Sequence, residues 1–249
     1  MAGFLGSGDL FFNRVVGGVS QGWLRFGNAT QFQIQENSEI KTRKSRQKAS
    51  YGQTLNSVAI KGDAEISITL DDLDKDNLAL AFLGTVSGVS VTGGSATAEV
   101  ATAIHDKSLE LANRKVSSVV VQDQTDTTTY VLGTDYEIEN AAMGFIKVLS
   151  TGAITDGQTL HISYDYATVA GNKVAGGTDA SIRVALRLDG ENLATQQPVI
   201  ADVYEAELSP QSGVDFLAED FANLELNGTL NTPSGKTEAY VLETDLAYT

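Results

Sequence analysis

The amino-acid sequence predicts a mainly β protein that also contains one α-helix and an inserted β-module. Several segments alternate apolar and polar residues with the period of two that is typical of a strand with one buried face. The chain has 24 glycines and only three prolines, which indicates many strands joined by glycine turns. A group of acidic residues followed by an apolar run predicts the helix. With 249 residues, the chain is long enough to bury a substantial core.

The clearest alternation lies in three segments that we expect to form strands. In residues 64–70, Ile66 and Ile68 alternate with polar residues, so that one face is apolar and the other is polar. The same pattern recurs in residues 182–189 and 224–230. Each of these strands should therefore bury one face and expose the other, as in an antiparallel sheet.

The remaining elements of the first and last parts of the chain follow from local signals. From Glu36 to Lys61 we expect two strands that flank a long polar loop at about residues 41–56. Acidic residues that suit the positive end of a helix dipole precede the apolar run, which predicts a helix at about residues 73–83. A second short helix is expected at Val214–Asp220.

Residues 86–177 are expected to form an inserted β-module between a first part, residues 1–85, and a second part, residues 178–249. Glycine-rich, loop-like ends bracket the module, at residues 93–98 and 176–178. Turn signals separate the apolar runs inside it. Five short strands are expected there: Val116–Gln122, Thr128–Leu132, Tyr136–Glu139, Phe145–Leu149 and Leu160–Tyr166.

Charge is distributed unevenly along the chain. Residues 1–60 carry seven Lys and Arg against three Asp and Glu, or +4, so that the total of −15 leaves −19 on the rest. A basic loop and an acidic body attract each other between copies, and such a contact builds rings or filaments. Two other interpretations stay open: a solvated loop, and a nucleic-acid-binding arm, which the acidic body would oppose. The cations of the basic run are Lys41, Arg43, Lys44, Arg46 and Lys48.

No motif in the chain predicts catalysis, a metal site or a cofactor. Cysteine is absent, which excludes disulfides and thiolate metal sites. Asp72, Asp74 and Asp76 resemble the start of a calcium loop, but the glycine and the bidentate glutamate that such a loop needs are missing. A helix start explains these carboxylates without a metal. His105 and His161 lack the spacing of zinc ligands, so we expect structural histidines and no enzyme.

The chain shows no sign of a membrane or secretory role. The first residues lack the basic and apolar regions of a secretory signal. No segment approaches the ~20 apolar residues that span a bilayer. The single tryptophan, Trp23, is expected to be a core or interface aromatic, although its face could also bind a sugar.

Two regions of the chain resemble the tail tube (major tail) proteins of long-tailed bacteriophages. The first region is a strand that leads into the short helix. The second region combines the alternating strand at residue 182 onward with the strand and turn segments that follow it. The resembling residues are 62–84, then 184–195, 199–210 and 216–228, with insert-like segments at 134–138 and 154–166.

This resemblance implies a β-sandwich or barrel flanked by one α-helix, with six copies closing into a ring whose inner strands form a continuous barrel. Rings would stack into the hollow tail tube of the virion, which encloses the tape measure protein and conducts DNA into the host. The implied partners are the protein itself, the tape measure protein, the tail terminator and the distal tail or baseplate proteins. Assembly would occur in the host cytoplasm, with no membrane involved and with only transient, non-specific passage of DNA.

In this family a long loop between early strands touches the neighbouring ring. The resemblance therefore implies inter-ring contacts for Lys41, Arg43, Lys44, Arg46 and Lys48. The inserted module is larger than the minimal tube fold needs, and we expect it on the outer surface. A lumen lined by acidic or neutral groups would repel DNA phosphates. A second class of function stays open, namely a carbohydrate- or cell-binding β-sandwich such as an adhesin or a pilus-like subunit.

Overall fold

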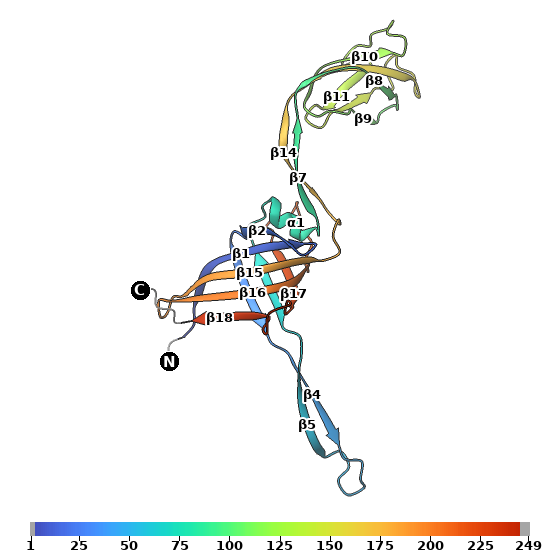
Figure 1. Ribbon diagram of the computed structural model, residues 1–249. Helices are drawn as coiled ribbons and strands as arrows, with labels where there is room; N and C mark the ends of the chain where they lie inside the picture. The colour runs from blue at the N-terminus through green and yellow to red at the C-terminus, as the bar shows by residue number, and fades with distance from the viewer. Residues whose placement is uncertain (1–2, 245–249) are drawn as a thin grey trace. The chain divides into compact units, whose positions relative to one another are not determined.

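The computed structural model describes residues 3–244 and confirms a mainly β protein with one short α-helix (Figure 1). The chain divides into two compact units. Unit 1 combines the chain up to Val86 with the chain from Val174 onward, and unit 2 is the continuous stretch Ser87–Lys173. These limits lie a few residues from the boundaries of 86 and 177 that the sequence suggested for the inserted module.

Unit 1 contains strands from both ends of the chain and the helix. Most of its strands join one antiparallel sheet, and two of them form a separate hairpin. The elements are β1 (Gly6–Val16), β2 (Val19–Arg25), β3 (Ala29–Gln35), β4 (Ser38–Lys44), β5 (Thr54–Lys61), β6 (Glu65–Leu70), α1 (Lys75–Ala81), β15 (Ile182–Asn192), β16 (Gln197–Pro210), β17 (Leu224–Leu230) and β18 (Tyr240–Thr244).

The sheet of unit 1 curls because its two end strands are joined directly. The strand order is β2-β1-β15-β16-β17-β6-β3, with β18 paired to β16, yet only three residues separate the end of β2 from the start of β3. In that link Phe26 is buried, and its N–H donates to the Leu10 carbonyl at 2.9 Å. Gly27 has a φ of +80°, and a Cβ there would lie 2.3 Å from an oxygen of Asp72. The link therefore requires glycine.

The core of unit 1 lies inside this curled sheet and uses the faces that the sequence predicted. The apolar positions of the three alternating segments are buried, except Leu188, which is partly buried, and their polar partners lie on the opposite face. Each fully buried Leu, Ile or Val stabilises the fold by about 1.5–3 kcal/mol relative to exposure. The predicted core residues that are buried are Ile66, Ile68, Leu70, Ile182, Val184, Leu186, Leu224, Leu226 and Leu230.

Helix α1 begins as predicted but ends differently. Asp74 is the N-cap, and its carboxylate accepts the N–H groups of Asp76 and Asn77 at 2.9 and 2.8 Å. At the other end Leu83, with a φ of 48°, takes the left-handed position that glycine usually occupies. The Gly84 N–H then donates to the Ala79 carbonyl at 2.7 Å, as in a Schellman motif. Gly84 is needed for another reason, since a Cβ there would lie 2.3 Å from the Ala175 carbonyl oxygen.

The second helix expected at Val214–Asp220 is wrong, because this stretch holds only a turn and bends. Short helices are stabilised mainly by packing an apolar face against something. Here Val214 packs against the core and Phe216 stacks on Phe82 with ring centroids 6.1 Å apart. Leu217 is 92% exposed, so within the chain the helical face would have nothing to cover it.

The chain passes between the two units along a pair of strands. β7 (Thr85–Val91) and β14 (Val169–Ala175) pair with each other as a two-stranded sheet. Most of their residues are exposed. Neither strand was expected from the sequence, because they lack the alternation that a buried face produces.

Unit 2 is a small β fold with its own core. One three-stranded sheet has the order β10-β13-β8, and the other has the order β11-β12-β9. Their apolar faces enclose a separate cluster that includes Val121, Ile146, Ile154, Leu160 and Ile162. The strands are β8 (Gly94–Thr102), β9 (Ser108–Glu110), β10 (Val116–Asp123), β11 (Tyr136–Asn140), β12 (Phe145–Val148) and β13 (Thr159–Tyr166).

Four of the five strands expected in this module are confirmed, and one is wrong. Residues 128–132 contain isolated bridges, Gln122–Thr129 and Leu132–Tyr136, instead of a strand. The glycine-rich stretch from Gly94 is not a loop but the start of β8, which pairs with β13. A short-side-chain strand of this kind buries little apolar surface, so its sequence resembles a loop.

Asp135 stabilises the turn between β10 and β11 of unit 2 and makes that unit sensitive to acid. Its buried carboxylate accepts the N–H groups of Val131 and Ala153, both at 2.7 Å. These hydrogen bonds, first the one from Val131, hold the pKa of Asp135 below its ordinary value of 3.8. Because the folded pKa is depressed, the stabilisation is complete above pH about 4 and is lost as pH falls through the folded pKa.

We expect Asp135→Ala to lower the free energy of unfolding of unit 2 by about 1 kcal/mol, since two part-buried hydrogen bonds to its carboxylate are lost. Hydrogen exchange of the amides of residues 131 and 153 at neutral pH would measure the loss. Glu137→Ala, at an exposed position, is the matched control. Equal acid sensitivity of the wild type and Asp135→Ala would contradict this role for the carboxylate.

Candidate assembly surfaces

The hairpin of β4 and β5 is a surface of unit 1 that has no partner within the described chain. In residues 3–244 the two strands pair with each other and with no other strand. Every residue of both strands is exposed, and in Figure 1 the hairpin extends beyond the ends of β3 and β6. An isolated hairpin is marginally stable in water. This hairpin would therefore be stabilised by a surface on which it can pack.

The tip of the hairpin is nevertheless ordered by its own hydrogen bonds. Ser45 is only 2% exposed, and its hydroxyl lies 2.7 Å from the Ser50 hydroxyl. Its N–H donates to the Gln53 carbonyl at 2.8 Å, and its carbonyl accepts the Gly52 N–H at 2.9 Å. The residues between Ser45 and Gln53 are thus held as a compact loop.

The five cations predicted in a loop at residues 41–56 are divided between strand and loop. Lys41, Arg43 and Lys44 lie on β4, and only Arg46 and Lys48 lie in the loop. The predicted loop included the end of β4, which is a strand. Both faces of β4 are exposed, so its sequence lacks the apolar alternation that identifies a strand. Lys41 and Arg43 share one face of the hairpin, and Lys44 comes after a register shift in the pairing.

Sequence reasoning missed the apolar residues of the hairpin. They stand beside the cations and are exposed to solvent. Val58 is opposite Lys41 in the pairing, and Ile60 is opposite Glu39. The apolar residues of β5 are visible in the sequence, but their exposure is not. The exposed apolar residues are Ile40, Tyr51, Leu55, Val58 and Ile60.

The arginines of the sheet contrast with the cations of the hairpin, because each has a carboxylate partner. Arg14 pairs with Asp179, Arg25 with Asp9, Arg187 with Asp202, and Arg183 with Glu205. Among the described residues, Arg43, Lys44, Arg46 and Lys48 form no ion pair, and Lys41 lies 3.7 Å from Glu39. The cations of the hairpin are therefore available to bind carboxylates of another molecule.

The outer face of β3, β6, β17 and the end of β16 carries no lysine or arginine. The pairing places Gln31 opposite Thr69, and Gln33 opposite Ser67. The face continues onto β17 and β16 through amides, hydroxyls and carboxylates. The residues further across are Glu65, Asn227, Thr229, Glu225, Glu207 and Ser209.

The end strand β2 carries exposed apolar residues on an unpaired edge. All seven of its residues are exposed, including Val19, Trp23 and Leu24. Of the two expected uses of Trp23, the core is therefore excluded and an interface stays a prediction. The Arg187 guanidinium lies 5.6 Å from the centre of its ring. Unpaired strand edges are sites where another chain can add.

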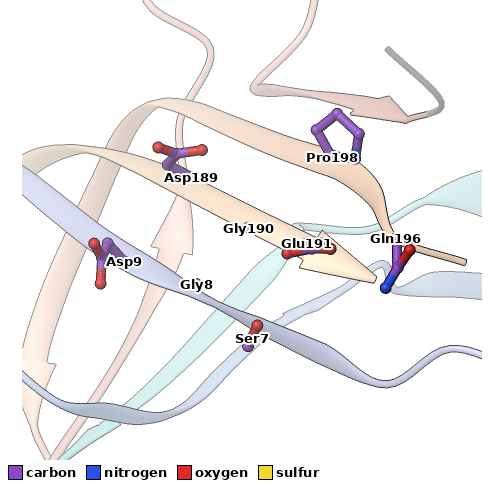
Figure 2. A pocket seen from close by; sticks show the side chains of 8 residues that line it. All are labelled: Ser7, Gly8, Asp9, Asp189, Gly190, Glu191, Gln196 and Pro198. Atoms are coloured by element: carbon purple, nitrogen blue, oxygen red, sulfur yellow. The ribbon is translucent and has the colours of Figure 1, made fainter. Parts of the chain in front are cut away.

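An open, acidic hollow of about 560 Å³ lies across β1 and β15 (Figure 2). Gly8 and Gly190 face each other in the pairing, and Figure 2 shows the carboxylates of Asp9, Asp189 and Glu191 around them. A Cβ on Gly8 would lie 2.6 Å from the Asp189 carbonyl oxygen, so these strands approach closely. Within residues 3–244 no group of three or more ligating side chains is arranged to hold a metal.

The remaining candidate residues take structural roles. Asp74 caps α1, as described above. His105 hydrogen-bonds through Nε2 to the Ile154 carbonyl at 2.8 Å. His161 hydrogen-bonds through Nδ1 to Asp126 at 2.7 Å, on the face of β13 opposite to the core of unit 2.

Residues 3–240 match the model of a family described as "Protein of unknown function UCP028589". The chain belongs to this family. The matched range runs through both units. A search of curated proteins finds no match. In the part of the chain that is described, no helix of this UCP028589 member is long and apolar enough to cross a membrane.

Proposed function

We propose that the protein is the tail tube subunit of a long-tailed bacteriophage, in which six copies form a ring and the rings stack into a hollow tube. The observation that carries this proposal is the exposed hairpin of β4 and β5, which combines cations without ion pairs and exposed apolar residues in a chain of formal net charge −15. Such a surface needs an acidic and partly apolar partner, and another copy of the chain supplies one. Contact between unlike surfaces of identical copies propagates head to tail.

The strand edges support ring closure. The sheet of unit 1 ends in β2 and β3, and the outer edge of each lacks a strand partner in the described chain. Addition of a neighbouring copy along an edge would satisfy these backbone groups and cover the exposed apolar residues of β2. Closed rings remove free edges from the assembly.

The face without cations supports a role as the wall of a DNA conduit. Its amides, hydroxyls and carboxylates provide no lysine or arginine to bind a phosphate, and its carboxylates repel phosphates. We propose that this face of β3, β6, β17 and β16 lines the lumen, where it would surround the tape measure protein before DNA passes. The tail terminator and distal tail or baseplate proteins would bind the ends of the tube.

The function can be tested by examining the purified protein for self-assembly. We expect native mass spectrometry to show hexamers, and negative-stain images to show sixfold rings stacked into tubes without added ligand. A protein that stays monomeric at high concentration and forms no ring would contradict the proposal. Binding to glycans or cells by such a monomer would favour the adhesin-like alternative instead.

A further inference from the structure

The stretch between β16 and β17, residues 211–223, exposes three large apolar side chains to solvent. Phe216, Leu217 and Phe221 are 71%, 92% and 96% exposed. Asp215 precedes Phe216, Glu219 and Asp220 lie between Leu217 and Phe221, and the stretch contains no lysine or arginine. We call residues 211–223 the acidic aromatic segment. Exposed apolar groups clustered in this way mark an interaction surface.

A hollow adjoins this segment and extends its acidic character. Its volume is about 580 Å³, and it is lined by Asn28, Asp71, Asp72, Asp220, Phe221 and Asn223. The side-chain amide of Asn28 donates to the Asp71 carboxylate at 2.8 Å. The hollow therefore combines an exposed phenyl ring, three carboxylates and amide groups.

The acidic aromatic segment and the hairpin lie at opposite ends of the same strand. The hairpin lies between Gln35 and Glu65, which pair with each other. The segment leads into Leu224, which pairs with Leu70 at the other end of β6. Six residues of β6 separate the two ends, a span of roughly 20 Å at the rise of a strand. Each copy thus presents the two surfaces in opposite directions.

The two surfaces are complementary in both charge and hydrophobicity. The hairpin joins cations to Ile40, Leu55, Val58 and Ile60, while the segment joins carboxylates to Phe216, Leu217 and Phe221. The seven residues of β4 alone extend roughly 23 Å at the rise of a strand, so the hairpin is long enough to reach a neighbouring molecule. No pairing between β4 or β5 and any other strand of the described chain occupies it.

We propose that the hairpin of one copy docks on the acidic aromatic segment of the next copy. The partner is a second copy of this chain, whose cations face the carboxylates while its apolar residues cover Leu217 and Phe221. This inference rests on the proposed stacking of rings. It identifies the acidic aromatic segment as the surface that the hairpin of the neighbouring ring contacts. It also explains why the stretch forms no helix in the single chain, since the apolar surface that it would pack on belongs to another molecule.

A charge-swap experiment tests this pairing directly. The receiving variant carries Asp215→Lys, Glu219→Lys and Asp220→Lys, and the hairpin variant carries Arg43→Glu, Lys44→Glu and Arg46→Glu. We expect each variant to raise the protein concentration needed for tube formation by roughly tenfold or more. The chain with all six substitutions restores opposite charges at the contact, and we expect it to form tubes again. Sedimentation and negative-stain imaging give the readout, with circular dichroism as the check on folding.

A matched control keeps the charge change and moves it away from both surfaces. Glu110→Lys, Glu137→Lys and Glu139→Lys alter exposed residues of unit 2, and we expect tubes of normal length. Normal tubes from the receiving variant, or no recovery in the six-substitution chain, would overturn the pairing. Neither result would disturb the proposed function, which fails only if the wild type and the control form no rings or tubes.

An apolar variant provides a second measurement that does not depend on charge. Leu217→Ser with Phe221→Ser changes two side chains that are almost fully exposed, so the subunit should fold normally. We expect this variant to stop elongation in both low and high salt, because apolar contacts are not screened. Wild-type elongation by this variant would show that the segment does not receive the hairpin.

Discussion

Replacing Arg43, Lys44 and Arg46 by Glu should stop the elongation of tubes while leaving the subunit folded and able to form rings. The three side chains are exposed and form no ion pair among the described residues, so the monomer loses nothing by the change. Exposed ion pairs contribute about 0.5 kcal/mol each. Three pairs repeated in six subunits then amount to on the order of 9 kcal/mol per ring junction, and reversal adds repulsion.

Negative-stain images and sedimentation would separate single rings from tubes in this experiment. The control is Lys107→Glu with Arg114→Glu and Lys115→Glu, which makes the same charge change at exposed positions of unit 2. We expect the control to elongate normally. Tubes of ordinary length from the hairpin variant would remove the hairpin from the stacking contact.

Removing unit 2 should leave a subunit that still folds and assembles into tubes of unchanged bore. Unit 2 encloses its own core cluster, and its chain enters and leaves along the paired strands β7 and β14. Gly84 and Ala175 lie in contact at the start of that pair, since a Cβ on Gly84 would come 2.3 Å from the Ala175 carbonyl oxygen. A short Gly-Ser linker from Val86 to Val174 can therefore replace residues 87–173 without straining unit 1.

Electron microscopy of the shortened subunit would measure both diameters of the tube. We expect the outer diameter to fall and the inner diameter to stay, because we propose that unit 2 lies outside the conduit. The matched control is a chain that keeps unit 2 and carries the same linker after residue 173. Loss of folding in the shortened chain, or a changed bore, would mean that unit 2 belongs to the tube wall.

The sequence predicted those parts of the fold in which one face is buried. In β6, β15 and β17 the burial of every second residue leaves an alternating pattern that reads directly as a strand. The start of α1 within this acidic stretch was predicted too, because first-turn carboxylates suit the start of a helix. Strands without a buried face leave no such pattern, so β14 was missed and the end of β4 was assigned to a loop.

The candidate surfaces were only partly predictable for a related reason. The sequence shows charged residues directly, so the cations at residues 41–48 could be predicted as a contact surface. The exposure of Phe221 and Val58 was not visible, because an apolar residue in a sequence suggests a core. The missing helix at residues 214–220 shows the same limit, since local propensity could not tell whether a packing surface was available within the chain.

The sheet of unit 1 pairs early strands of the chain with late ones. This pairing constrains the order of folding. The Leu5 N–H donates to Asn192 across 187 positions, and β1 pairs with β15 from Gly6 to Arg14, whereas unit 2 is continuous. During synthesis at 5–20 residues per second, unit 2 is complete before β15 emerges from the ribosome. β1 can pair with β2, and β3 with β6, as soon as they are made. β1 and β6 wait roughly 8–35 s for their second partners, β15 and β17.

If the protein assembles as we propose, polymerisation would be delayed until translation is nearly finished. Neither the sheet that would close a ring nor the acidic aromatic segment at residues 211–223 exists until the last quarter of the chain has been made. A nascent chain that already carries the basic hairpin cannot yet receive one. In the proposed assembly, the order of the strands along the chain would thus disfavour growth on nascent chains.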